Sequence, residues 1–364
     1  MKIGIDARLY GIRHRGLGRY TQKLIEQLEQ LDHENEYVIF LQPEEFEQYQ
    51  PTNPKFIKVL VPYRPYSWQE QLVFPQLIGK HHPDLMHFPH FNVPVIYGCP
   101  YIVTIHDLII THYPTSRATT RNKFVYQLKL IGYRIIVKLA AKRARQVVTV
   151  SDFTKQDIIK LLGVAESKVV RIYEGADPVS PAQTEPIFAP QTYFLSVGAA
   201  YPHKNLEFLC KAFSRFATDK DYKLILVGRQ DVFYERLEQS LTDEQKKNII
   251  FFGEATDEQL ANLYRNALAY VFPSLLEGFG LPALEAQSAN IPVISSNLSS
   301  LPEVLGDSAL FFDPNNQQAL IDELQKISND SALRSKLIEQ GGENIKRFSW
   351  EQMGREILKI YTRC

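Results

Sequence analysis

The chain has 364 residues, enough for two or three domains of ordinary size. Hydrophobic residues make up 45% of it and charged residues 23%, which is typical of a globular protein and excludes a disordered one. The 41 basic and 41 acidic side chains cancel, which argues against a dedicated nucleic-acid-binding protein.

The cysteines and the apolar runs indicate a cytoplasmic protein. The three cysteines, Cys99, Cys210 and Cys364, are too far apart in sequence for a zinc motif or a disulfide framework. The opening MKIGIDARLYG predicts a strand that contains a charge and does not resemble a signal peptide. No stretch approaches 18 uninterrupted apolar residues, so no membrane-spanning helix is expected.

In the first half of the chain, predicted strands alternate with helices. In order, these are the strand Met1–Ala7, a loop rich in glycine and arginine at Gly11–Gly18, the helix Tyr20–Leu31, the strands Tyr37–Leu41 and Lys55–Val61, the helix Trp68–Leu77, the strands Leu85–Phe88, Tyr101–Ile105 and Gln146–Val150, a helix capped by Ser151, and the strand Val169–Tyr173. Short strands that alternate with helices imply a mostly parallel sheet covered by helices.

Four prolines between Pro178 and Pro190 predict a linker, after which the alternation restarts. The second half is expected to contain the strand Tyr193–Val197, the helix Leu206–Phe216, the strands Lys223–Val227 and Ile249–Phe252, a helix from the capping box at Thr256–Gln259 to Ala267, and the strands Ala269–Phe272 and Pro292–Ser295. Two α/β halves joined by a linker predict a ligand-binding cleft between them.

The zero net charge conceals a basic half and an acidic half. Residues 1–180 carry 23 Lys and Arg against 17 Asp and Glu, and the remainder carries 18 against 24. Between Leu108 and Ser151 there is no acidic residue, whereas basic residues are interleaved with apolar ones. The basic residues of this segment are Arg117, Arg121, Lys123, Lys129, Arg134, Lys138, Lys142, Arg143 and Arg145.

Two interpretations of this basic segment remain open. It is either a surface helix with a solvated face, or a patch that binds an anionic membrane surface or an anionic lipid-linked acceptor. For the second interpretation the candidate contacts are Arg117, Arg121, Lys123, Lys129 and Arg134, and the protein would sit peripherally at the inner face of the plasma membrane.

The chemistry is expected in a loop of the second half, from Ser274 to Glu285. Glycines flank Phe279 and a helix begins directly after them, which together form a site for a phosphate group. Because carboxylates aimed at a phosphate would repel it, Glu277 and Glu285 are better interpreted as acceptors for sugar hydroxyls on the two sides of a diphosphate. Lys204, in the first strand–helix loop of this half, can supply positive charge to a departing diphosphate.

These residues resemble the retaining glycosyltransferases of family four. The spacing from Glu277 to Glu285 matches the motif of two glutamates separated by seven residues that characterises these enzymes. The resemblance extends over most of the chain through motifs at Gly16–Thr21, Thr104–Leu108, Val150–Thr154, Tyr201–Asn205 and Asn297–Glu303. The first two of these motifs are also similar to mannosyltransferases that build bacterial surface polysaccharides.

The resemblance implies a GT-B fold, in which two Rossmann-like α/β domains face each other across a cleft. It implies an acceptor-side domain at residues 1–178 and a nucleotide-sugar-binding domain at residues 179–345. The C-terminal helix, within residues 346–364, is expected to pack back on the first domain.

The resemblance also implies a role for each matching residue. Glu277 would contact the hydroxyls of the donor sugar, Lys204 would neutralise the departing diphosphate, and His106 would act at the reacting sugar from the first domain. Glu285 would bind the ribose of the nucleotide. Further contacts to the donor are implied for Gly16, Gly18, Gly253, Glu254, Phe279, Gly280 and Leu281.

The sequence departs from the family pattern at one position of the phosphate site. Ala199 follows Gly198, where many relatives carry an arginine. Either the phosphate contacts are fewer here, or Arg229 completes them.

By resemblance, the reaction transfers a hexose with retention of configuration and needs neither a metal nor a cofactor. The donor is a nucleotide-sugar, with mannose and therefore GDP-mannose favoured, and the acceptor is a glycan or a polyprenyl-linked sugar. No nucleic-acid partner is expected. The histidines of the first half do not provide the helical i, i+4 pair with a carboxylate that zinc hydrolases use.

Three other functions are less consistent with the sequence. The loop Gly11–Gly18 lacks the Gly-x-Gly-x-x-Gly pattern of a nicotinamide dehydrogenase. A nucleotide-sugar epimerase of the same fold needs an additional acid–base set that is not found here. A non-catalytic sugar-nucleotide-binding subunit would be expected to lack Glu277 or Lys204, and both are present.

Overall fold

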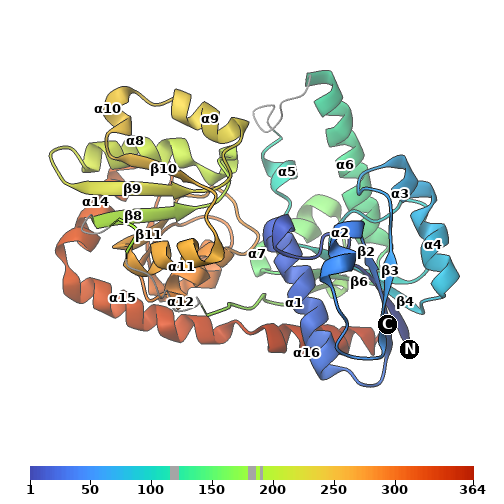
Figure 1. Ribbon diagram of the computed structural model, residues 1–364. Helices are drawn as coiled ribbons and strands as arrows, with labels where there is room; N and C mark the ends of the chain where they lie inside the picture. Colours follow the sequence, from blue (N-terminus) through green and yellow to red (C-terminus); the bar gives the residue numbers. More distant parts are fainter. Residues whose placement is uncertain (115–122, 179–185, 189–191) are drawn as a thin grey trace. The chain divides into compact units, whose positions relative to one another are not determined.

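Two parallel β-sheets, each formed by its own part of the chain, organise the protein in the computed structural model, which describes residues 1–114, 123–178, 186–188 and 192–364 (Figure 1). The N-terminal unit comprises Met1–Thr111, Phe124–Gly175 and Ser349–Cys364. The C-terminal unit comprises His112–Lys123 and Ala176–Phe348. The prediction of two α/β halves with parallel sheets is therefore confirmed.

The sheet of the N-terminal unit has the order β3-β2-β1-β4-β5-β6-β7 in the described part of the chain. Its strands are β1 (Lys2–Asp6), β2 (Glu36–Leu41), β3 (Phe56–Leu60), β4 (Leu85–Phe88), β5 (Tyr101–Ile105), β6 (Gln146–Thr149) and β7 (Val169–Arg171). The helices of this part of the chain are α1 (Arg15–Leu31), α2 (Pro43–Gln48), α3 (Trp68–Leu72), α4 (Phe74–His81), α5 (Ile109–His112), α6 (Lys123–Arg143), α7 (Asp152–Asp157) and, from the C-terminus, α16 (Trp350–Tyr361).

The sheet of the C-terminal unit has the order β10-β9-β8-β11-β12-β13 in the described part of the chain. Its strands are β8 (Thr192–Val197), β9 (Tyr222–Val227), β10 (Ile249–Gly253), β11 (Ala269–Phe272), β12 (Val293–Ser296) and β13 (Ala309–Phe312). Its helices are α8 (Leu206–Phe216), α9 (Val232–Gln239), α10 (Asp243–Lys246), α11 (Asp257–Asn266), α12 (Leu281–Ser288), α13 (Leu301–Leu305), α14 (Gln317–Asn329) and α15 (Ser331–Asn344).

Both sheets reverse their strand order at one place, and this place positions the sites described below. Counted from its own first strand, each sheet begins 3-2-1-4-5-6, the order of dinucleotide-binding folds. The reversal lies between β1 and β4 in the N-terminal unit and between β8 and β11 in the C-terminal unit. Ligands of open α/β sheets bind beside the carboxyl ends of the strands at such a point.

Apolar runs and capping residues predicted several elements well. The central strands β5 and β11 are buried along their whole length, because helices cover both faces of a parallel sheet, and their predicted bounds are correct. Ser151 caps α7 by accepting the N–H of Thr154, and Thr256 and Gln259 form the predicted capping box of α11.

Two predicted elements were wrong in their extent. The helix expected at 68–77 is split into α3 and α4 at Val73, because Pro75 lies in the first turn of α4 and has no N–H to continue α3. The loop expected at 11–18 ends early, because α1 begins at Arg15 and already contains Gly16 and Gly18 in its first turn. A Cβ on Gly18 would collide with the carbonyl oxygen of Gly11, so this glycine permits a close backbone approach.

The C-terminal helix α16 packs against α1 within the N-terminal unit, as Figure 1 shows for the red and blue helices. A Cβ on Gly354 would lie 2.8 Å from Cβ of Gln27, so the two helices approach closely. The hydroxyl of Tyr361 lies 2.7 Å from Nδ1 of the fully buried His87, whose Nε2 lies 2.9 Å from Oγ1 of Thr104. Helix α16 thereby supplies a polar partner to the centre of the sheet.

His87 is expected to make the N-terminal unit sensitive to acid. Burial, and to a smaller extent the nearby His106, lowers the pKa of His87 from 6.5 to about 3. Its neutral ring is favoured in the folded state, so the stabilising contribution is complete above pH 6.5 and is lost as the pH falls toward 3. Through this one group, the free energy of unfolding should fall by about 2 kcal/mol between pH 6.5 and pH 5.

In the His87→Gln variant, the part of the fall in the free energy of unfolding at acid pH that is due to His87 should disappear. Urea unfolding followed by tryptophan fluorescence measures it, because both tryptophans, Trp68 and Trp350, belong to the N-terminal unit. An equal fall in the free energy of unfolding between pH 6.5 and pH 5 in the variant and in the unmodified protein would contradict the prediction.

Candidate active site

Loops that follow β8 and β11 carry the residues that the sequence singles out in the C-terminal unit. The loop after β8 ends in a short 3-10 helix, Pro202–Lys204, and the loop after β11 contains Glu277. The N–H of Leu275 donates to the carbonyl oxygen of His203 at 2.7 Å and thus holds the two loops together. The site therefore lies where the strand order reverses.

Lys204 and Glu277 form an ion pair in this place. Nζ of Lys204 lies 2.6 Å from Oε1 of Glu277, and their side chains are 20% and 10% exposed. A lysine has three N–H donors, so two remain for an anion, and the second carboxylate oxygen can still accept from a hydroxyl. Burial and the charge of Lys204 lower the pKa of His203 to about 4, so this neighbour is neutral at pH 7.

The turn between β11 and α12 presents backbone N–H groups at the start of a helix. Gly280 ends the turn at a φ of 114°, and a Cβ there would lie 2.9 Å from Cδ2 of Leu301. No side chain caps α12, so the N–H groups of its first turn point toward any bound anion. The ring of Phe279 is buried edge-on against Phe348 at 5.4 Å.

Two serines hold this turn in shape and were not assigned a role from the sequence. The N–H of Glu277 donates to Oγ of Ser299 at 3.0 Å. The hydroxyl of the fully buried Ser300 lies 3.0 Å from the carbonyl oxygen of Glu277 and 3.1 Å from that of Phe279. Both serines lie in a matched motif, but no spacing along the chain shows that the loops after β11 and β12 touch.

Glu285 lies on α12 beside a tyrosine that the sequence also missed. The hydroxyl of Tyr264, from α11, lies 3.1 Å from Oε2 of Glu285 and 3.3 Å from the carbonyl oxygen of Pro282. Tyr264 is almost fully buried, so it orients the carboxylate from within the unit. This places Glu285 about one helical turn beyond the start of α12, where the sequence predicts an anion site.

Glycines at the ends of three neighbouring strands extend this edge of the sheet. The N–H of Gly228 donates to the carbonyl oxygen of Gly253 at 2.9 Å, and a Cβ on Gly228 would collide with the carbonyl oxygen of Gly198. Arg229 and Glu254 follow directly in sequence, are both exposed and form no ion pair with any other described residue. The predicted donor contacts Gly253, Glu254 and Arg229 thus share one edge.

The predicted catalytic residue of the N-terminal unit, His106, follows β5. Its Nδ1 lies 3.0 Å from Oε1 of Glu174, and its Nε2 lies 3.0 Å from the carbonyl oxygen of Pro89. These two contacts fix the orientation of the ring. The ring of Tyr20 packs edge-on at 4.6 Å. Glu174 was not found from the sequence, because 68 residues separate it from His106.

The two predicted glycines of this unit differ in their surroundings. Gly18 is required for the contact with Gly11, whereas a Cβ on Gly16 would meet nothing within 4 Å. Gly16 is also exposed, so α1 leaves the backbone at this position accessible.

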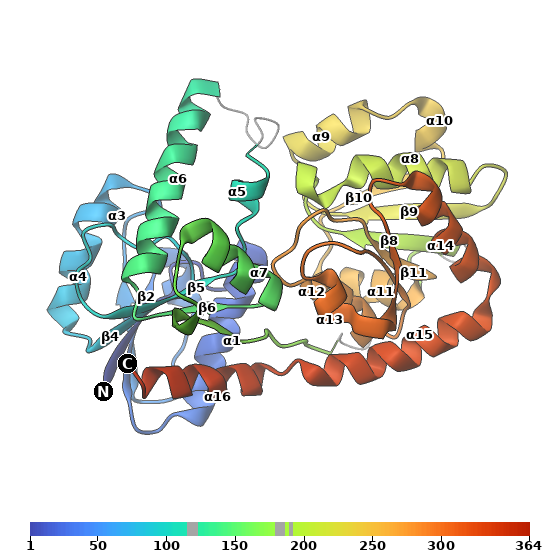
Figure 2. The same ribbon diagram turned by 180° about the vertical axis from the view of Figure 1, so that it is seen from behind.

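Helix α6 carries three of the basic residues proposed for an acceptor or a membrane, Lys123, Lys129 and Arg134, and its N-terminal half extends away from the sheet (Figure 2). Lys129 and Arg134 are exposed. Arg117 and Arg121 lie outside the described residues, as does the side chain of Lys123. Within the ranges that the structure describes, no helix has the length and apolar character needed to cross a bilayer.

An apolar stripe on the outer face of α6 lies among these basic residues. Leu128, Ile131 and Ile135 are 56%, 52% and 52% exposed and recur at helical spacing, whereas Leu130 and Val137 on the opposite face are buried. The helix therefore presents apolar and basic side chains together to its surroundings.

Comparison with known proteins assigns the family. The family model described as "Glycosyltransferase Family 4" matches residues 14–179, and the model described as "Glycosyl transferases group 1" matches residues 182–344. The chain is 31% identical over 296 residues to O-antigen chain mannosyltransferase B of Escherichia coli, a match that covers 76% of this chain and 74% of that protein. The chain is a group 1 glycosyltransferase. The family predicted from its motifs is confirmed.

A second relative agrees with this assignment of the glycosyltransferase, and two solved structures share its fold. O-antigen chain mannosyltransferase RfbU of Salmonella typhimurium is 32% identical over 286 residues, with 78% of this chain and 73% of the relative covered. Sucrose-phosphate synthase from Thermosynechococcus elongatus superposes with a TM-score of 0.78 at 20% identity, over 100% of this chain and 98% of that one. Anabaena Alr3699/HepE in complex with UDP and glucose superposes with a TM-score of 0.75 at 17% identity, over 100% of this chain and 99% of that one. These two structures support the GT-B fold.

The described residues of the glycosyltransferase form no obvious metal site. Among the residues that the structure describes, no group of three or more His, Cys, Asp or Glu side chains is placed to hold a metal ion. The absence of a metal requirement stays a prediction, and the experiment in the next subsection tests it.

Removal of the Glu277 carboxylate is expected to abolish most of the transferase activity and to leave the fold intact. In Glu277→Ala, Lys204 loses its partner but is expected to stay hydrated, because its side chain is already 20% exposed, whereas the donor would lose the contact predicted for Glu277. We expect turnover to fall by about a hundredfold or more, the order found when one transition-state contact is deleted. Nucleotide release measures turnover, and circular dichroism measures folding.

The matched control for this variant is Glu207→Ala. It breaks another lysine–glutamate pair of the same unit, Glu207 with Lys211 at 2.7 Å on α8, and should leave turnover unchanged. Near-normal turnover in a folded Glu277→Ala protein would contradict the role assigned to Glu277.

Proposed function

We propose that this glycosyltransferase moves a hexose, with mannose favoured, from a nucleotide-sugar to a glycan or polyprenyl-linked acceptor during assembly of a surface polysaccharide. Two relatives at 31% and 32% identity bear the name O-antigen chain mannosyltransferase, which supports mannose and therefore GDP-mannose as the donor. Transfer with retention of the anomeric configuration is part of the proposal and rests on the family resemblance.

The observation that carries the proposal is the Lys204–Glu277 pair beside the uncapped start of α12. A departing diphosphate would accept the two remaining N–H groups of Lys204 and the backbone N–H groups at the start of α12. Negative charge develops on that diphosphate as the sugar leaves, so these donors stabilise the transition state more than the ground state.

Carboxylates on both sides of this anion site would bind neutral groups of the donor. Glu277 keeps one oxygen for a hydroxyl of the sugar, and Glu285, oriented by Tyr264, would accept from the ribose. His106, held by Glu174 and Pro89, is assigned to the reacting sugar from the N-terminal unit. A lysine and a helix start supply the positive charge that a divalent cation would otherwise provide, which supports a metal-independent reaction.

The donor is tested by incubating the protein with GDP-mannose and with UDP-hexoses, with and without an extract that contains polyprenyl-linked acceptors. We expect GDP release from GDP-mannose that depends on the extract and persists in EDTA. NMR of the product should show the same anomeric configuration as in the donor. Loss of activity in EDTA would contradict metal independence, and release from none of these nucleotide-sugars would contradict the proposed function.

We place this reaction at an anionic membrane surface, contacted through α6. Its exposed Leu128, Ile131 and Ile135 suit the boundary between headgroups and acyl chains, and Lys129 and Arg134 are exposed on the same helix for the anionic headgroups. Each basic residue near such a surface contributes about 1 kcal/mol, so a cluster of them is sufficient for reversible binding.

Co-sedimentation with liposomes that contain anionic lipid tests this placement. We expect binding at low salt that weakens at high salt, because ions screen the attraction. The triple charge reversal of Lys129, Arg134 and Lys138 to Glu should weaken binding by at least about a hundredfold. The same change at the exposed Lys220, Lys326 and Lys346 of the C-terminal unit should have little effect. No binding of the unmodified protein at low salt would leave α6 as a solvated surface helix.

A further inference from the structure

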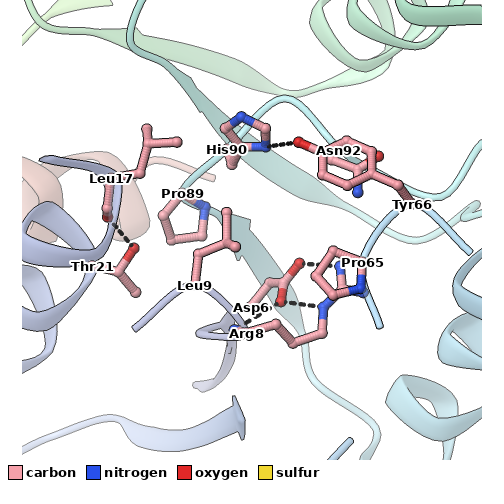
Figure 3. Close-up of a pocket in the computed structure, with 10 residues that line it drawn as sticks. All are labelled: Asp6, Arg8, Leu9, Leu17, Thr21, Pro65, Tyr66, Pro89, His90 and Asn92. Carbon is pink, nitrogen blue, oxygen red and sulfur yellow. Dashed lines mark hydrogen bonds and ion pairs between the residues drawn. The ribbon is translucent and has the colours of Figure 1, made fainter. Parts of the chain in front are cut away.

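A small cavity lies at the point where the sheet of the N-terminal unit reverses its strand order. It has a volume of about 20 Å³ and is lined by Asp6 and Arg8, which end β1 and follow it, and by His90 and Asn92, which follow β4 (Figure 3). Thr21 of α1 also lines it. This is the counterpart of the place that Lys204 and Glu277 occupy in the other sheet, and no residue of the proposed donor contacts lines it.

A buried ionic cluster forms the floor of this cavity. Arg8 donates to Asp6 through Nε and Nη2, each at 2.7 Å, and its Nη2 also lies 2.7 Å from Oε1 of Glu70. The side chains of Arg8 and Glu70 are 3% and 0% exposed. Two carboxylates around one guanidinium fix the position of its remaining nitrogen, Nη1.

Two polar atoms of the lining residues have no hydrogen-bond partner among the described residues. They are Nη1 of Arg8, a donor, and Oδ1 of Asn92, an acceptor. Both residues are more than nine-tenths buried, and the amide nitrogen of Asn92 is fixed by its bond to Oε1 of Glu70 at 2.7 Å. A buried polar group without a partner is costly, so these two atoms indicate that a ligand group or a water completes their hydrogen bonds at this cavity.

An aromatic residue is held at the rim in a conformation that costs free energy. Tyr66 has a φ of 62°, in the left-handed region that side chains other than glycine rarely adopt, and its N–H donates to Oε2 of Glu70 at 2.6 Å. Its side chain is exposed, and its hydroxyl lies 3.5 Å from Nδ1 of His90. The cluster that positions Arg8 and Asn92 therefore also holds an aromatic ring beside the cavity (Figure 3).

The charges around the cavity favour a neutral ligand group. Asp6 by itself balances the charge of Arg8, so the cluster has no net positive charge in either protonation state of Glu70, whose pKa is raised by burial. Burial, followed by the charges of His106 and Arg8, lowers the pKa of His90 to about 3, so His90 is neutral as well. A phosphate would find no free positive charge here, whereas a hydroxyl needs only a donor and an acceptor.

We propose that this cavity binds one hydroxyl group of the acceptor sugar, which accepts from Nη1 of Arg8 and donates to Oδ1 of Asn92, while Tyr66 packs against the sugar ring. The proposal rests on the proposed function and specifies its acceptor, whose group bound in this cavity is a neutral sugar and not the lipid-linked diphosphate.

Binding of small sugars tests the assignment without requiring turnover. The probes are methyl α-mannoside, methyl α-glucoside and methyl α-galactoside, titrated by ligand-observed NMR. We expect at least one to bind, and Asn92→Ala to weaken it by about tenfold. Tyr66→Gly should also weaken binding while the fold is retained, because glycine adopts the left-handed conformation without strain.

The matched control is Asn53→Ala in the same unit. Asn53 is buried like Asn92 and bonds to backbone carbonyls of Glu29 and Asp32, but it does not line the cavity. It should leave sugar binding unchanged. GDP binding should be the same in all variants, so a failure of the donor site is distinguishable from a failure of this proposal.

Monodeoxy derivatives of the bound methyl glycoside identify the contact itself. The derivative that lacks the hydroxyl facing Asn92 should bind the unmodified protein about tenfold more weakly and should bind Asn92→Ala no more weakly than the parent sugar does. If removal of that hydroxyl weakened binding equally in the unmodified protein and in Asn92→Ala, the proposal would be overturned. It would also be overturned by binding of none of the three glycosides, by binding that is indifferent to Asn92→Ala as expected for a cavity that holds only water, or by tighter binding of mannose 1-phosphate in the same place.

Discussion

The ion pair between Lys204 and Glu277 joins the loops that leave β8 and β11, the two strands between which the C-terminal sheet reverses its order. Taking two charges largely out of water is costly, and it is offset here by their separation of 2.6 Å and by the hydrogen bond that links His203 to Leu275. The pair therefore fixes an ammonium group beside the uncapped start of α12, and the proposed diphosphate site depends on that placement.

The two sheets share a strand order but present different polar groups at their reversal points. In the C-terminal unit the ammonium of Lys204 and the N–H groups of α12 present donors to an anion. In the N-terminal unit Asp6 and Glu70 neutralise Arg8, and among the described residues that line the cavity one donor and one acceptor are left without a partner. One topology can thus support a charged ligand and a neutral one, because the loops and not the strands supply the side chains.

Carboxylates in this protein position other groups as often as they present themselves to a ligand. Glu174 and the carbonyl of Pro89 fix both nitrogens of His106, and Glu70 holds Arg8, Asn92 and the strained backbone of Tyr66 at once. At Glu285 the roles are exchanged, because the hydroxyl of Tyr264 orients the carboxylate. Such outer contacts limit the rotamers of the groups that would touch substrate, which preserves the geometry that transfer requires.

The sequence by itself determined the α/β class, most strand positions, the caps at Ser151 and Thr256, and the group Lys204, Glu277 and Glu285, because each is encoded by local periodicity or by a short motif. It could not show that Val73 separates two helices, or that Ser299, Tyr264 and Glu174 support the site. Those contacts join residues far apart in the chain, and only the order in which the strands assemble brings them together. The tertiary structure alone also shows that atoms of Arg8 and Asn92 are buried without a partner, because burial is a property of the folded chain and not of any segment.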